Sequence, residues 1–372
     1  MDSGLDNQAL RVDRAERVDR EERGSRGPQD KAQIEKDILS GKIPFPYRAS
    51  WSESPQACMA RFRSYESKIS NHPYRLRAFH PQYKLIRAPL FRCKFCCIVS
   101  EESTIDVLSD IFQEPARMLA YRPGYPSPYD AWKDPKVVKV VVGKAKNTTP
   151  QELRKALYNT IPEAKPFRMT WVKGIATILQ LHNRTVLDIS AGWGDRLLAS
   201  MGLGWEYTGY DPNRGLEPGH TRMIETFGHP DKHKVHYEPF ENAMIQGTYD
   251  LILSSPPFFD IEIYTQDSSQ SVIQYPEFET WMKRFLFASL RKAWGALATG
   301  GSMVLHLGDS GRYSICEPVL LFVGELEGSV FEGVIGLSSP TGDPRPVWVW
   351  KKGLGECGFV RGGLVDLYPQ LA

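Results

Sequence analysis

A Ser-Pro-Pro-Phe tetrapeptide, residues 255–258, begins at the last residue of the apolar run 249–255. Pro256 and Pro257 fix the backbone and stop strand pairing, which holds the carbonyls of Ser255 and Pro256 in a rigid turn. These carbonyls and the Ser255 hydroxyl are able to accept both hydrogens of an amino group. The planar exocyclic amine of a base is a poor nucleophile, and accepting its protons localises the lone pair towards an electrophile. Phe258 offers a stacking face for such a base. The alternative interpretation is that the prolines only end a strand.

A second candidate site is the stretch Asp188-Ile-Ser-Ala-Gly-Trp-Gly-Asp195, where a predicted strand passes into a helix. Gly192 and Gly194 let the backbone come close to a ligand at the helix N-terminus. Asp211 ends the next predicted strand, 23 residues after Asp188, and an acid at this place is able to accept hydrogen bonds from both hydroxyls of a ribose. The glycine spacing does not fit the GxGxxG dinucleotide fingerprint. A tight strand-to-helix turn without a ligand is the alternative.

The acid and the two glycines resemble the first motif of the class I S-adenosylmethionine-dependent methyltransferases, an acid followed by glycines at +2, +4 and +6. Ser190 stands at +2 in this chain, and the amino-methyltransferases of nucleic acids also lack that glycine. The turn at 255–258 lies about 60 residues further on, and it is similar to the D/N/S-P-P-aromatic motif of the same enzymes. The resemblance covers roughly residues 165–352.

The resemblance implies three sets of site residues. The set expected to bind S-adenosylmethionine is Asp188, Ser190, Ala191, Gly192, Gly194, Asp211, Phe240 and Glu241. Within it, Asp211 is expected on the ribose and Phe240 or Glu241 near the adenine ring. The catalytic set is Ser255, Pro256, Pro257 and Phe258. The substrate-binding set is Phe259, Asp260, Glu262 and Tyr264, for which solvated loop residues are the alternative. No metal is implied, and a core role is expected for His306.

The elements that must position these residues alternate between strands and helices. Strands are expected at 185–190, 207–211, 234–240, 249–255, 302–309, 330–337 and 346–352, and helices at 167–182, 195–203, 219–228 and 278–297. Such alternation predicts an α/β fold with a parallel sheet covered by helices on both sides. With the resemblance, it implies a Rossmann-like, seven-stranded class I methyltransferase sheet within a domain of residues 161–372. Ligands bind such sheets at the carboxyl ends of the strands.

The N-terminal part has a different composition. Residues 1–30 are dense in charge and contain a six-residue repeat at 11–16 and 17–22, which predicts a disordered tail, with helix formation on an assembly partner as the alternative. Residues 31–160 are rich in proline and aromatic residues and lack a regular period, which indicates an extension or small domain. From Trp51 to Cys97, nine Lys or Arg residues outnumber two acids. Cations neutralise phosphates and aromatic rings stack on bases, so this stretch predicts contact with DNA or RNA. A solvated surface is the alternative.

Three thiols of this region, Cys93, Cys96 and Cys97, lie close together in the chain. A structural zinc site needs four ligands, and Cys58, His72 or His80 would have to complete it. Because no second pair has zinc-finger spacing, buried free thiols are the favoured interpretation.

Composition excludes several classes of protein. The chain has 372 residues, a formal net charge of +2 and six cysteines, which argues against a secreted disulfide scaffold. No apolar run approaches the ~18 residues of a membrane span, so an intracellular protein of the cytoplasm or nucleus is expected.

The function expected from the resemblance is methyl transfer to an exocyclic amine of a nucleic-acid base, of the N4-cytosine or N6-adenine type. Two alternatives stay open. One is a methyltransferase for an RNA cap or a protein nitrogen, and the other is a methyltransferase-fold subunit with a structural role in a larger particle. About 20 residues follow the last predicted strand, so any recognition of sequence or shape is expected in the N-terminal 160 residues.

Overall fold

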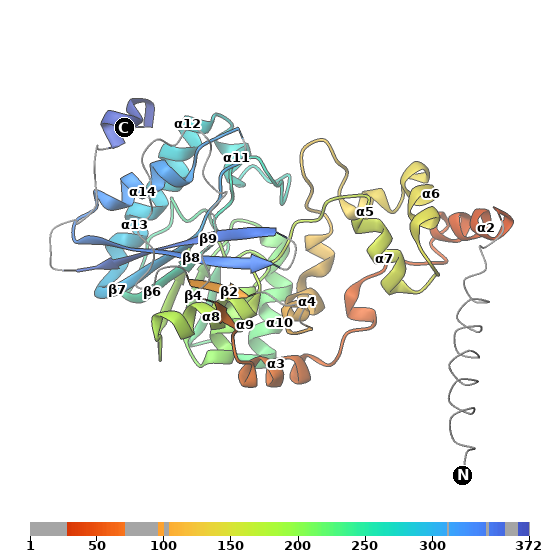
Figure 1. Cartoon of the computed structure of the whole chain (residues 1–372), viewed down its shortest axis with the longest axis horizontal. Helices are drawn as coiled ribbons and strands as arrows, with labels where there is room; N and C mark the ends of the chain where they lie inside the picture. The colour runs from red at the N-terminus through yellow and green to blue at the C-terminus, as the bar shows by residue number, and fades with distance from the viewer. Residues whose placement is uncertain are drawn as a thin grey trace, which may run out of the picture. The chain divides into compact units, whose positions relative to one another are not determined.

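The structure, a computed structural model, describes residues 28–70, 96–99, 104–310, 312–339, 342–353 and 364–371 (Figure 1). Contacts divide the chain into two compact units. The first unit comprises Met1–Tyr47 and Pro126–Pro162, and the second comprises Arg48–Tyr125 and Glu163–Ala372. The predicted tail lies outside the described residues except for Pro28–Asp30, which begin a helix.

The described part of the first unit is helical. Its helices are α2 (Pro28–Leu39), α5 (Pro128–Ala131), α6 (Pro135–Lys144) and α7 (Pro150–Tyr158). The last three begin with a proline whose missing N–H costs nothing at the first helical position. The Ser127 and Asp134 side chains cap α5 and α6 by accepting backbone N–H groups. This segment therefore has more regular structure than its proline content suggested.

The second unit is built on a sheet of nine strands rather than the predicted seven. The strands are β1 (Ile69–Ser70), β2 (Cys96–Val99), β3 (Thr185–Asp188), β4 (Glu206–Tyr210), β5 (His233–His236), β6 (Tyr249–Ser254), β7 (Leu297–His306), β8 (Ser329–Ser339) and β9 (Gly342–Lys352). Their order is β1-β2-β8-β9-β7-β6-β3-β4-β5. The prediction of seven was wrong because β2 pairs in parallel with β8 and adds two strands at that edge. The short β1 and β2 lie in a region without a strand-like period.

The parallel strands β5-β4-β3-β6-β7 follow the doubly wound order 3-2-1-4-5. β9 is antiparallel to both of its neighbours, β7 and β8. Strand order reverses between β3 and β6, so the carboxyl ends of these two strands mark the switch point where a ligand site is expected. The fold is thus the Rossmann-like α/β arrangement that the sequence predicts.

Helices cover both faces of the sheet. They are α3 (Pro55–Ser64), α4 (Leu108–Arg117), α8 (Met169–Leu179), α9 (Asp195–Leu203), α10 (Glu217–Phe227), α11 (Ser271–Gln274), α12 (Phe278–Thr280), α13 (Ala288–Ala296), α14 (Cys316–Gly324) and α15 (Leu364–Leu367). Single turns lie at η1 (Arg48–Ser50), η2 (Ile105–Val107), η3 (Arg214–Leu216) and η5 (Pro369–Leu371), and the π-helical η4 (Trp281–Phe287) joins α12 to α13. In Figure 1, α13 and α14 lie on one side of the sheet and α8, α9 and α10 on the other.

Alternate residues of each strand feed two separate cores. Leu187 and Trp348 pack with α13 and α14, whereas their neighbours Val186 and Val347 pack with α8 and α9. This alternation is the period of a strand buried on both faces. The sheet is consequently held in place from both sides, and its carboxyl ends form a rigid base for a site.

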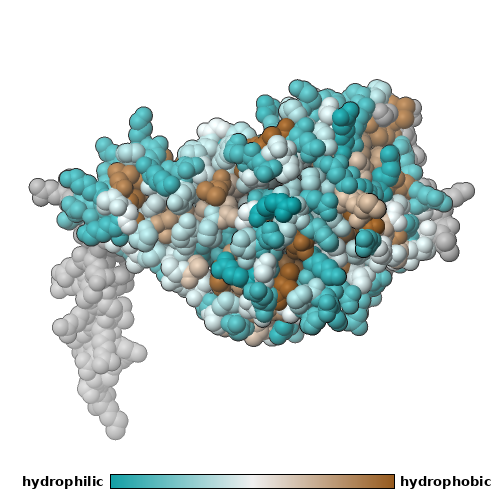
Figure 2. All heavy atoms as spheres, turned by 180° about the vertical axis from the view of Figure 1, so that it is seen from behind, coloured by the Kyte–Doolittle hydropathy of each residue, from teal (hydrophilic) through white to brown (hydrophobic). Residues whose placement is uncertain are grey.

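The face in Figure 2 is largely hydrophilic, with hydrophobic residues in scattered groups. Single exposed apolar side chains such as Leu39, Val140 and Met244 are ordinary for a folded protein. In the described ranges, no helix is both long enough and apolar enough to cross a bilayer.

Candidate active site

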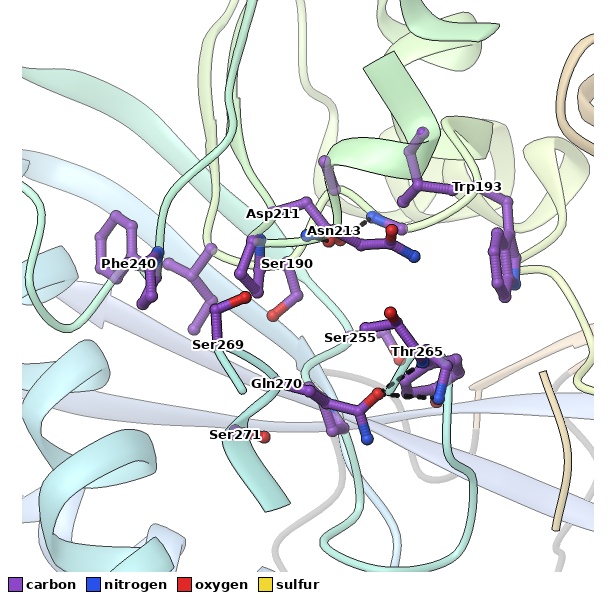
Figure 3. Close-up of a pocket in the computed structure, with 18 of the residues that line it drawn as sticks. Ser190, Trp193, Asp211, Asn213, Phe240, Ser255, Thr265, Ser269, Gln270 and Ser271 are labelled. Carbon is purple, nitrogen blue, oxygen red and sulfur yellow. Dashed lines mark hydrogen bonds between the residues drawn. The ribbon is translucent and has the colours of Figure 1, made fainter. Parts of the chain in front are cut away.

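A pocket opens at the carboxyl ends of β3, β4, β5 and β6, at the switch point of the sheet. It encloses about 960 Å³ of empty space, its open mouth included. Most lining residues come from four segments after strands, namely Ile189–Trp193, Asp211–Asn213, Pro239–Glu241 and the stretch that begins at Ser255. Figure 3 shows Phe240 towards one end of the pocket, Trp193 towards the other, and Asp211 and Ser255 between them.

The turn after β3 is fixed by Asp211. One Asp211 carboxylate oxygen accepts the Gly192 N–H at 2.9 Å, and the other accepts the Asn213 N–H at 3.0 Å. Gly192 has φ +57°, a left-handed conformation that glycine adopts without strain. Burial raises the pKa of Asp211 to about 6, although the two N–H groups oppose that rise. The wall of the pocket thus contains a partly buried carboxyl group, that of Asp211, whose charge depends on pH.

His220 fixes the same turn from behind. Its Nε2 lies 2.9 Å from the Gly192 carbonyl oxygen, and its Nδ1 lies 3.2 Å from the Tyr237 hydroxyl. Burial lowers the pKa of His220 to about 4, so the ring is neutral at physiological pH. His220 was not predicted, and as a lone histidine on a helix it carries no sequence signal.

Asp188 does not line the pocket. It is fully buried and accepts hydrogen bonds from Arg196 Nε at 2.7 Å, the Ser254 hydroxyl at 2.7 Å and the Tyr207 hydroxyl at 2.8 Å. Arg196 in turn donates to the Ser190 carbonyl. Asp188 therefore joins three strands beneath the turn, and Ser190, Ala191 and Gly192 form the pocket wall above it.

Gly194 also lies outside the lining, and its role is close packing. It has φ +84°, and a Cβ at this position would lie 2.6 Å from Met223 Sδ and 3.1 Å from His220 Cδ2. A side chain here would push α10 away from α9. The two glycines of the motif thus serve different purposes, because only Gly192 faces the pocket.

The turn after β5 carries Phe240 and Glu241 into the lining. Lys292 holds this turn by donating to the carbonyl oxygens of Phe240, Glu241 and Ala243 at 3.2, 2.6 and 2.7 Å. The Phe240 ring packs edge-on against Tyr210. Burial raises the pKa of Glu241, and Tyr275 and Lys292 counteract that shift.

Of the tetrapeptide after β6, Ser255 and Pro257 line the pocket. Pro256 is buried, and Phe258 lies beyond the lining with its ring 5.5 Å from that of His306 in an edge-on contact. His306 is buried against the Pro346 carbonyl oxygen, 2.9 Å from its Nδ1, and burial lowers its pKa to about 4. The serine thus faces the cofactor-sized cavity, while the phenylalanine packs beside it.

The predicted substrate residues separate into two groups. Tyr264 lines the pocket, 5.8 Å from the Trp193 ring, and donates its hydroxyl to Glu262 at 2.9 Å. Asp260 pairs with Arg312 at 2.9 Å, away from the lining. Phe259 is a core residue, 4% exposed, with φ +59° and its ring 5.0 Å from that of Tyr313.

Gln270 holds the segment after the tetrapeptide. Its side-chain oxygen accepts the N–H groups of Tyr264 at 2.9 Å and Thr265 at 2.7 Å, drawn as dashed lines in Figure 3. Gln270 is 5% exposed, so both bonds are shielded from water. Gln270 and Thr265 line the pocket and were not predicted, because polar residues in a loop have no distinguishing pattern.

Helix α4 supports the site from the N-terminal part of the chain. Ser109 donates to Asp195 at 2.7 Å, and Gln113 donates to the Leu216 carbonyl oxygen at 2.7 Å. Burial raises the pKa of Asp195, which lines the pocket, to about 7. This helix was not predicted, because its buried face carries polar side chains among the apolar ones.

The structure describes no group of three or more His, Cys, Asp or Glu side chains able to hold a metal ion in the ranges it covers. Cys58 is buried as a free thiol. Cys93, His72 and His80 lie outside the described residues, as does most of the basic stretch.

No protein-family model matches the chain, and no curated protein sequence matches it significantly. Solved structures are similar over about half of it. TrmN from Thermus thermophilus is 16% identical with a TM-score of 0.37, over 50% of this chain and 49% of that one. An rRNA methylase from Streptococcus thermophilus is 12% identical with a TM-score of 0.35, over 51% and 99%. A putative S-adenosyl-L-methionine-dependent methyltransferase from Methanococcus maripaludis is 16% identical with a TM-score of 0.36, over 50% and 85%.

Proposed function

We propose that this protein is an S-adenosylmethionine-dependent methyltransferase that acts on an exocyclic amine of a nucleic-acid base. One observation carries the proposal, namely that Asp211, Gly192 and Ser255 all line a single pocket at the switch point of the sheet. A ribose-binding acid, a close backbone approach and an acceptor after a rigid proline turn are the parts that this reaction needs.

The residues of the pocket fit S-adenosylmethionine, which supplies an electrophilic methyl group when bound. Asp211 is set to accept the two ribose hydroxyls, because its carboxylate is already oriented by two N–H groups. Phe240 and Glu241 flank the adenine end, and the turn of Ser190–Gly192 holds the methionine end. Trp193, Asn213 and Gln270 enclose the rest of the cavity and exclude water.

Ser255 is the residue proposed to act on the amine. Its hydroxyl oxygen and the neighbouring carbonyls accept the amine hydrogens, which directs the nitrogen lone pair towards the methyl group. This interaction strengthens as the nitrogen becomes tetrahedral, so it contributes more to the transition state than to the ground state. The acids among the described lining residues are Asp195, Asp211 and Glu241. Asp195 is held by Ser109 and Asp211 by the backbone. The methylated nitrogen is strongly acidic, so its extra proton leaves to solvent water and no side chain is assigned as a base.

The test is methylation of mixed DNA and RNA with isotopically labelled cofactor, followed by mass spectrometry of the nucleosides. The expected result is label on the exocyclic nitrogen of cytosine or adenine. Ser255→Ala should lower kcat more than it raises KM, with affinity for S-adenosylmethionine kept. Ser64→Ala, on the exposed end of α3, is the control and should behave as wild type. Full activity of Ser255→Ala would remove the catalytic assignment, and no cofactor affinity in calorimetry would overturn the proposal as a whole.

A further inference from the structure

Three arginines from distant parts of the chain lie close enough together for their charges to interact. Arg122 follows α4, Arg168 precedes α8, and Arg345 lies on β9. We call these three residues the arginine cluster. None of the three lines the pocket itself. Each is linked, through one neighbouring residue, to a residue that lines the pocket or to one that packs on the tetrapeptide.

Arg122 is attached through Glu262. Backbone hydrogen bonds in both directions between Tyr121 and Ile263, at 2.9 and 2.8 Å, place the two segments side by side. Arg122 Nη2 then lies 3.2 Å from one Glu262 oxygen, while the other accepts the hydroxyl of the pocket residue Tyr264. Arg122 Nε is buried and has no hydrogen-bond partner within the described part of the chain. The Arg122 side chain as a whole is 40% exposed, so its terminal N–H groups are open to a ligand.

Arg168 and Arg345 approach from the side of His306. Arg168 follows the pocket residue Phe167, and its guanidinium carbon lies 5.5 Å from the centre of the Trp171 ring. Phe167 packs on His306, as does Phe258 of the tetrapeptide. Arg345 immediately precedes Pro346, whose carbonyl oxygen is bound to His306. His306 is thus the common neighbour of Phe258, of Phe167 and of Pro346, and the last two adjoin the two arginines in the chain.

The charges of the cluster act on one another. Loss of hydration lowers the pKa of Arg345; Glu262 opposes that shift, and the positive charges of Arg168 and Arg122 add to it. Glu262 acts on Arg122 and Arg345, and Asp106 acts on Arg168, so three guanidinium groups outnumber two carboxylates. The remaining positive charge destabilises the folded protein unless an anion neutralises it. Planar guanidinium groups bind phosphate with paired N–H donors, and clusters of them are typical of phosphate sites.

We propose that the arginine cluster binds a backbone phosphate of the substrate and so presents the attached base to Ser255. The inference rests on the proposed function and names its substrate class, a phosphodiester-linked nucleic acid rather than a protein or a small amine. Tyr264 and Glu262 form a rigid wall between the arginine cluster, proposed to bind the phosphate, and Ser255, proposed to bind the amine. The fold therefore sets the distance between the phosphate and the amine of the bound substrate.

The test measures binding of fluorescein-labelled single-stranded DNA and RNA oligonucleotides to the full chain at increasing salt. Arg345→Gln and Arg122→Gln should each weaken binding by about tenfold or more, and each should reduce the salt slope by about 0.7 per lost phosphate contact. The affinity of Arg345→Lys should lie between those of wild type and Arg345→Gln, because lysine keeps the positive charge but lacks the paired N–H donors of a guanidinium group. Arg312→Gln is the matched control, an arginine paired with Asp260 of the same segment but 76% exposed, and it should match wild type.

A peptide nucleic acid of the same base sequence has no phosphates, so its affinity should be equal for wild type and variants. Comparison of the DNA titration with the RNA titration shows which polymer supplies the phosphate. Unchanged affinity and slope in both glutamine variants would overturn the inference, as would an acidic peptide that competes as well as the oligonucleotide, or a wild type that binds neither polymer. Cofactor affinity, measured in parallel, should stay at the wild-type level in every variant. If the wild type itself has no affinity for S-adenosylmethionine, that result would instead count against the proposed function.

Discussion

The carboxyl group of Asp211 titrates close to physiological pH. Its pKa of about 6 means that the carboxylate loses its charge in mildly acidic solution, and a protonated acid accepts hydrogen bonds from the ribose hydroxyls less well. Affinity for S-adenosylmethionine should therefore fall as the pH drops through about 6. Asp211→Asn should bind at least about tenfold more weakly at neutral pH, with little pH dependence. Calorimetry on both sides of this pH measures the effect, and a flat wild-type profile would contradict it.

Asp195 links the stability of the fold to pH. Burial raises its pKa from 3.8 to about 7, so the folded state keeps a proton that the unfolded state releases between these values. The free energy of unfolding should thus fall as the pH rises from about 4 to about 7. Asp195→Asn keeps an acceptor for Ser109 and removes the titration. It should gain roughly 1–3 kcal/mol over wild type at pH ~8 and little at pH ~4, close to the pKa of the unfolded state.

Denaturant unfolding at these two pH values checks the Asp195 prediction. An equal pH dependence of wild type and Asp195→Asn would show that other groups cause it. Ser109→Ala is a useful control, because it removes the donor to the carboxylate and leaves the acid in place. Loss of that donor should raise the pKa of Asp195 and extend the fall in stability to higher pH.

Residue types and spacing predicted the place of the pocket but not the task of each member. Gly192, Asp211 and Ser255 reach the lining, whereas Asp188, Gly194 and Phe259 support it from the core. A motif identifies a segment whose backbone must adopt one conformation. It does not distinguish the residues that contact a ligand from the residues that fix this conformation. Contacts such as Arg196 to Asp188 join residues through space, and the sequence alone does not display them.

At the scale of elements, proline explains the largest difference between expectation and structure. Pro55, Pro128, Pro135 and Pro150 each stand at the first position of a helix. Proline also ends helices and strands, so the high proline content of this region by itself suggested loops. The Ser54, Ser127 and Asp134 caps beside these prolines are the signal that separates the two uses. The strands from residue 185 onward were predicted best where they are buried apolar runs, as in β6. The polar, half-exposed β5 ends at His236, earlier than the predicted residue 240.

Close packing between α4 and α10 depends on Gly219. This residue lies in α10, and a Cβ there would lie 2.3 Å from the Gln113 side-chain carbon. Gly219→Ala should cost about 1–3 kcal/mol of stability, because the buried Gln113 side chain must shift away from its hydrogen bond to the Leu216 carbonyl oxygen. Gly295→Ala in α13 is the matched control, since nothing lies within 4 Å of the position that its methyl group would take, and it should gain about 0.5–1 kcal/mol. Thermal unfolding compares the two, and equal effects would argue against close packing at Gly219.

For the whole molecule, the basic and aromatic stretch from Trp51 to Cys97 stays a prediction, since residues 71–95 lie outside the described ranges. If it follows a phosphate backbone, nucleic-acid affinity should fall steeply with salt, with a log–log slope of about −0.7 to −0.9 per contacted phosphate. Replacing Arg75 and Arg77 by glutamate should flatten that slope while leaving cofactor affinity unchanged. Anisotropy titrations at several salt concentrations measure it, and a salt-independent affinity would exclude this stretch as a binding surface.

The pairing of β2 with β8 has a consequence for how the chain is made. Cys96 lies opposite Ile335 in that ladder, so the first of these strands leaves the ribosome about 240 residues before its partner exists. At ~5–20 residues per second, that interval is roughly 12–50 seconds. During this time the nascent β2 has an unsatisfied edge of N–H and C=O groups, which favours aggregation. Completion of the sheet at this edge is therefore a late event in the making of the chain.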